Sequence, residues 1–138
     1  MHLGEAWLPQ RFFYLFVGAA YLLLWIQVVL LHWRGAFRHA AMWGPVLLSP
    51  VLAVMGIAFS FVHGDSVPWL FVVIFSLGTL AGTAGTLYHL KGVRYYIGGF
   101  TLRNFMAGPP VVLPLLFAAL SAAALLMFFL WPVRAGGF

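Results

Sequence analysis

Four stretches of this 138-residue chain are apolar, carry no formal charge and are long enough to cross a lipid bilayer. A hydrocarbon core about 30 Å thick is spanned by about 20 helical residues. Inside hydrocarbon each backbone amide must be satisfied within the protein, and no stretch shows the two-residue alternation of a membrane barrel. The sequence therefore predicts an all-α membrane protein, one domain over residues 1–138 with four transmembrane helices in a bundle and short loops. The predicted spans are residues 12–33, 42–62, 69–90 and 110–131.

The composition agrees with lipid as the solvent of the chain. Hydrophobic residues make up 64% of the sequence and charged residues 7%, whereas an ordinary soluble domain has about 25% charged residues. The basic residues are spread between the apolar stretches instead of forming a phosphate-binding patch, so we expect no nucleic-acid partner. The chain has no cysteine, which excludes disulfides, iron–sulfur clusters and thioether-linked haem.

The basic residues also predict the orientation. Five of the seven lie in the first and third loops and two lie on the opposite side, together with both acidic residues, Glu5 and Asp65. We expect the chain to lie in a bacterial inner membrane, and the positive-inside rule then places the first and third loops in the cytoplasm and both termini in the periplasm. The five loop residues are Arg34, Arg38, Lys91, Arg94 and Arg103, and the other two are Arg11 and Arg134.

Residues 91–108 form the one sizeable segment outside the predicted spans, and they mix aromatic, aliphatic, glycine and basic side chains. Such a segment is typical of a connector that lies in the membrane interface. A specific docking or headgroup site is the alternative. Two prolines within the spans, Pro50 and Pro114, are expected to kink their helices.

Catalytic groups are scarce. Neither of the two carboxylates lies within a span, and no Ser-His-Asp or paired-carboxylate arrangement can be drawn. We therefore expect a protein that is not an enzyme by itself. A periplasmic metal site built from His2, Glu5, His63 and Asp65 is conceivable, but no local spacing supports it.

Two histidines are the strongest candidates for a cofactor site. His32 closes the first predicted helix and His89 closes the third. These two helices run in the same direction, and each histidine lies at a similar distance from the start of its helix, so both imidazoles should reach the same depth on the cytoplasmic side. Bis-histidine ligation of haem b needs that arrangement. His39 is an alternative partner for His89, and interfacial placement alone would also explain both histidines.

A glycine stripe leads to His89. Gly78, Gly82, Gly85 and His89 follow spacings of four, three and four residues, so they share one face of a helix. This stripe predicts either a groove for a flat tetrapyrrole, haem b or a chlorophyll-type pigment, or the ordinary close packing of membrane helices through small residues. Gln27, in the first span, is predicted to be buried with an interhelical hydrogen-bond partner.

These features together predict a small non-catalytic subunit of a multi-subunit inner-membrane assembly. Electron transfer or quinone chemistry is the favoured role, with haem b or another tetrapyrrole on the cytoplasmic side and with lipid and other membrane subunits as partners. The alternative is a small homo-oligomeric transporter or channel for an uncharged solute, since the spans contain no charge.

Overall fold

The structure, a computed structural model, describes residues 9–61 and 68–130. Four of its helices are long and apolar enough to cross a membrane, and the described residues contain no strand. The prediction of an all-α, multi-pass membrane protein is confirmed. The elements are α1 (Pro9–Arg34), a 3₁₀ turn η1 (Ala40–Met42), α2 (Trp43–Phe61), α3 (Pro68–Gly92), a π-helical turn η2 (Val93–Ile97), α4 (Leu102–Ala107) and α5 (Val112–Leu130).

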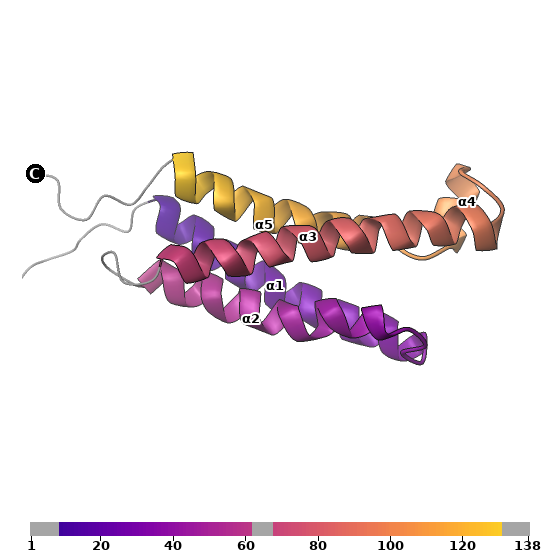
Figure 1. The fold of residues 1–138 in the computed structure, drawn as a ribbon, viewed down its shortest axis with the longest axis horizontal. Coiled ribbons are helices and arrows are strands. Elements are labelled where there is room, and N and C mark those ends of the chain that lie inside the picture. Colours follow the sequence, from indigo (N-terminus) through magenta and orange to yellow (C-terminus); the bar gives the residue numbers. More distant parts are fainter. Residues whose placement is uncertain (1–8, 62–67, 131–138) are drawn as a thin grey trace, which may run out of the picture.

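The four long helices form two antiparallel hairpins, α1 with α2 and α3 with α5 (Figure 1). The hairpins lie close together at the end where α1 and α3 begin, which we call the converging end. They separate towards the end where α1 and α3 finish, which we call the diverging end. Because α1 starts and α5 finishes at the converging end, the chain completes an even number of crossings.

Glycines close the first hairpin. A Cβ atom added to Gly18 would lie 2.7 Å from the Ile57 backbone nitrogen and 2.8 Å from the Ala53 carbonyl oxygen. A Cβ on Gly56 would lie 2.9 Å from the Gly18 nitrogen. Only hydrogen fits at these two positions, so α1 and α2 approach through their backbones, as small residues allow in membranes.

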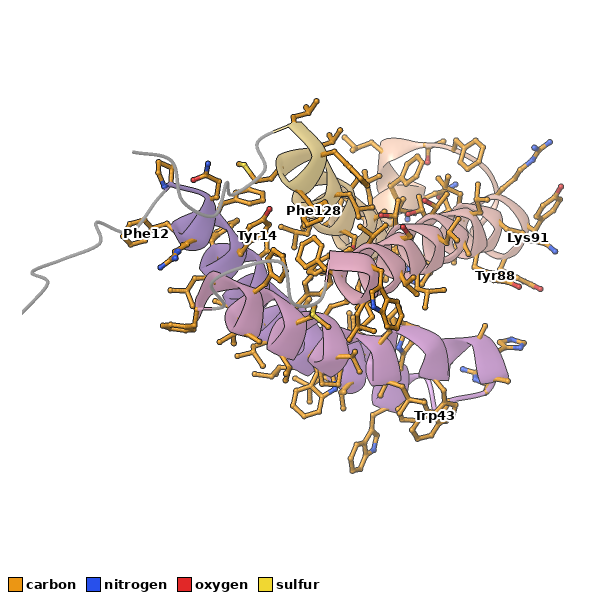
Figure 2. The ribbon with its side chains drawn as sticks, turned by 60° about the vertical axis from the view of Figure 1, so that its left-hand side comes forward. Phe12, Tyr14, Trp43, Tyr88, Lys91 and Phe128 are labelled. Carbon is orange, nitrogen blue, oxygen red and sulfur yellow. The ribbon has the colours of Figure 1, made fainter. Side chains whose placement is uncertain are left out.

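Aromatic rings from all four long helices join the hairpins at the converging end. The ring of Tyr14 lies 5.3 Å from that of Phe59 and 5.4 Å from that of Phe71. The ring of Phe71 lies 5.3 Å from that of Phe128. Figure 2 shows Tyr14 and Phe128 pointing into the bundle, whereas Phe12 points away from it. The two Tyr14 contacts are edge-on and the Phe71–Phe128 contact is stacked, and both arrangements suit the charge distribution of aromatic rings.

The hydrophobic core ends well before the diverging end. Its α1 members lie between Tyr14 and Leu24, and its α3 members are Phe71 and Phe75, in the first half of that helix. Near its limit, the Tyr21 hydroxyl donates a hydrogen bond of 2.6 Å to the Phe117 carbonyl of α5. The same hydroxyl lies 2.5 Å from the Ser121 hydroxyl oxygen.

The observed helices match the predicted spans to within a few residues at each end. Val62 and Trp131, the predicted last residues of the second and fourth spans, lie outside the described residues. Pro50 is inside α2 as predicted. Pro114 lies inside α5 as predicted, but in the first turn, because the helix begins at Val112, and a first-turn proline gives up no helical hydrogen bond.

The prediction that Gln27 is buried is wrong. Its side chain is exposed, since the face of α1 that carries Tyr21, Leu24 and Val28 turns towards the bundle and Gln27 lies outside that stripe. No group in the described part of the chain hydrogen-bonds the Gln27 amide.

Candidate functional site

His32 and His89 extend the inward-facing stripes of their helices beyond the hydrophobic core. In α1 the buried residues Leu24 and Val28 precede His32 by eight and four positions, which is helical spacing. In α3 the buried glycines Gly78 and Gly82 lead to His89 in the same way. Both histidines are partly buried, and both lie in the last turn of their helix, at the diverging end.

His32 and His89 each lie in the last turn of their helix, α1 and α3 respectively. These two helices run in the same direction from the converging end (Figure 1), so residues equally far along each helix come to a similar level. That the two imidazoles share a ligand stays a prediction.

His89 is held by a backbone carbonyl. Its Nδ1 atom lies 2.8 Å from the carbonyl oxygen of Pro110. A carbonyl oxygen can only accept a hydrogen bond, so Nδ1 must carry the proton, and the neutral ring then has its lone pair on Nε2. A hydrogen bond from one ring nitrogen to a backbone carbonyl is the usual way in which a ligating histidine is oriented.

His32 has an unsatisfied ring nitrogen. Its Nδ1 atom is buried and makes no hydrogen bond to any part of the chain that the structure describes. Its ring lies 6.3 Å from that of Phe37, which in turn stacks on Trp43 at 4.4 Å. The apolar neighbours explain the lack of a partner, and a buried nitrogen without one can accept a ligand.

The glycine stripe of α3 is covered by α5. A Cβ on Gly82 would lie 2.7 Å from the Ala118 Cα atom, and one on Gly85 would lie 3.0 Å from the Pro114 Cβ atom. At Gly78 it would collide with the Ser121 hydroxyl. Of the two interpretations of the stripe, the structure therefore has close helix packing, and these three glycines position α5 against α3. The cofactor hypothesis then rests on the histidines alone.

The structure describes one further histidine, His39. His39 is exposed and precedes the η1 turn. His2 and His63, with Glu5 and Asp65, lie outside the described residues. Within residues 9–61 and 68–130 there is no group of three or more histidine, cysteine, aspartate or glutamate side chains that could hold a metal ion.

Sequence reasoning missed three features, two of the fold and one of the site. The Gly18–Gly56 approach needs two distant residues to be paired, and nothing local announces that pairing. The bond from Tyr21 to Ser121 is equally remote in sequence. The Pro110 carbonyl that holds His89 is a backbone group, although the Gly-Pro-Pro segment that ends at this residue was a visible signal of a fixed turn.

Comparison with protein-family models, curated proteins and solved structures finds nothing that matches this chain. Its function must therefore be inferred from its own residues.

Proposed function

We propose that this chain is a small, non-catalytic subunit of a bacterial inner-membrane assembly for electron transfer or quinone chemistry, and that it binds haem b between α1 and α3 on the cytoplasmic side. The observation that carries the proposal is the His32–His89 pair. The two imidazoles lie in the last turns of the parallel helices α1 and α3, and the Pro110 carbonyl holds the ring of His89 with Nε2 free.

The residues present fit such a group. Two neutral imidazoles from different helices are the axial ligands of a low-spin b-type haem. When bound, the haem would supply one-electron transfer. The protein would orient one ligand through Pro110 and bury the other beside Phe37, on the apolar side of α1.

Membership of a larger assembly is supported by Gln27. This amide is exposed on the outer surface of α1, seven residues before the helix ends at Arg34, which is about 10 Å along the axis. Its neighbours Leu23, Ile26 and Leu30 are exposed and apolar. An amide facing hydrocarbon without a hydrogen-bond partner is costly, and a polar group supplied by another membrane subunit would remove that cost.

The test is an absorption spectrum of the protein purified with its native complex. We expect a reducible low-spin b-type spectrum. His89→Ala should abolish it, because the oriented ligand is lost, and His32→Ala should abolish it or convert it to high spin. His39→Ala is the matched control and should leave the spectrum unchanged. A colourless preparation of the intact complex would overturn the proposal for haem and for any other tetrapyrrole.

A further inference from the structure

The segment that joins α3 to α5, residues 91–110, forms a folded cap at the diverging end. It contains the η2 turn and α4, and it lies farther along the molecule than the end of the α1–α2 hairpin (Figure 1). Lys91 and the neighbouring Tyr88 point outwards at this end (Figure 2). The cap has a specified conformation and a distinctive surface.

Several backbone and side-chain bonds fix the cap. Gly98 and Gly99 have φ angles of +112° and +106°, which favour glycine. The Asn104 side-chain amide donates to the Gly99 carbonyl at 2.8 Å, and the Thr101 hydroxyl accepts from the Asn104 backbone N–H at 3.2 Å, as the N-cap of α4. The Gly108 N–H donates to the Asn104 carbonyl at 2.8 Å and ends that helix.

The interior of the cap is closely packed. Val93 is completely buried, and a Cβ on Gly108 would lie 3.1 Å from its side chain. A Cβ on Gly92 would lie 2.8 Å from the Pro109 ring. The side chains on the outer surface of the cap are therefore presented from a well-defined backbone.

The outer surface of the cap combines positive charge with large apolar groups. Residues 91–110 include no acidic residue. Tyr96, Met106 and Leu102 are 82%, 81% and 79% exposed, which is unusual for side chains of this size in water. We call this the cap surface, and its exposed members are Lys91, Arg94, Tyr95, Tyr96, Phe100, Leu102, Arg103, Phe105 and Met106.

The cap surface lies at the level of lipid headgroups. From Trp69 to His89 the α3 helix rises about 30 Å, the thickness of a hydrocarbon core. Lys91 and Arg94 follow directly, where the phosphate layer begins. Leu102 and Met106 lie one helical turn apart on α4, so they share a face.

We propose that the cap surface binds anionic phospholipids of its own leaflet. Lys91, Arg94 and Arg103 contact the phosphates, while Tyr96, Leu102 and Met106 enter the edge of the acyl region. Charge complementarity selects anionic over zwitterionic lipid, and the apolar side chains are satisfied by the same lipids. The inference does not depend on haem binding.

The first experiment measures lipid retention by the full chain. The protein is purified from vesicles of phosphatidylcholine mixed with phosphatidylglycerol, and the co-purifying lipid is measured. We expect phosphatidylglycerol to be enriched, and the double variant Arg94→Gln/Arg103→Gln to reduce that enrichment about tenfold. The matched control, Arg34→Gln/Arg38→Gln, removes the same charge from the other loop and should cause a smaller loss. Equal losses in the two variants, or no enrichment at all, would overturn the proposal.

The second experiment leaves the basic residues unchanged and measures how deep the cap lies in the membrane. The chain has no cysteine, so Met106→Cys gives a single site for a nitroxide label. In vesicles the label should be accessible to oxygen and protected from a water-soluble nickel complex. Access to the nickel complex would mean that the cap stands in water. Protection from both reagents in native membranes would mean that a protein covers it, and either result would reject lipid as the occupant.

Discussion

Tyr21 connects the two hairpins through hydrogen bonds to α5, and its effect on stability can be measured directly. Tyr21→Phe removes the bonds to Phe117 and Ser121 while keeping the ring, so it should lower the free energy of unfolding by about 1 kcal/mol. Ser121→Ala leaves the bond to the Phe117 carbonyl and should cost less. Reversible unfolding in mixed micelles gives both values. A larger loss in Ser121→Ala than in Tyr21→Phe would show that the serine acts through other contacts.

Side-chain hydrogen bonds differ in how far the local sequence determines them. The hydroxyls of Thr79, Thr83 and Thr86 donate to carbonyls of their own helix, those of Phe75, Thr79 and Gly82. These partners follow from helix geometry alone. Gln27 was predicted wrongly because its partner, or the lack of one, depends on which face of α1 meets the other helices. Nearly every neighbour of Gln27 is apolar, so hydropathy does not distinguish the buried face from the exposed face.

The contact between α3 and α5 depends directly on glycines, which have no side chain to separate the two helices. Gly82→Leu would place a branched chain against the Ala118 backbone, and it should destabilise the bundle by about 3 kcal/mol. Gly44→Leu is the control, since nothing lies within 4 Å of a Cβ at Gly44. Thermal unfolding in detergent should show a lower midpoint for Gly82→Leu alone. Equal midpoints would mean that α5 can shift away from α3 without loss.

At the scale of helices, the sequence predicted the existence and the positions of the four spans well. It predicted less well which helices pack against each other. The four spans were visible because charge is excluded from hydrocarbon over a fixed thickness. The sequence did not show what packs against the glycine stripe, since a stripe of small residues can accommodate either a neighbouring helix or a macrocycle. The depth of His32 and His89 could be predicted by counting along parallel helices, whereas the Gly18–Gly56 contact needed knowledge of which helices are neighbours.

For the whole molecule, the uneven distribution of basic residues predicts both termini in the periplasm. A cysteine replacing Ser66 should react with a membrane-impermeant maleimide added to intact cells. A cysteine replacing Ala40, which is exposed at the start of η1, should react only after the cells are opened. The reverse pattern would invert the orientation while leaving the four helices as they are.

The separation of the two hairpins gives the molecule the shape of a wedge. At the converging end, aromatic rings from all four long helices hold the hairpins together, and at the other end α1 with α2 stands apart from α3 with α5 (Figure 1). A wedge occupies more cross-sectional area in one leaflet than in the other. The two leaflets around this protein must therefore contain unequal numbers of lipids, and the membrane can restore the balance only by bending or by accepting another protein on the narrow side.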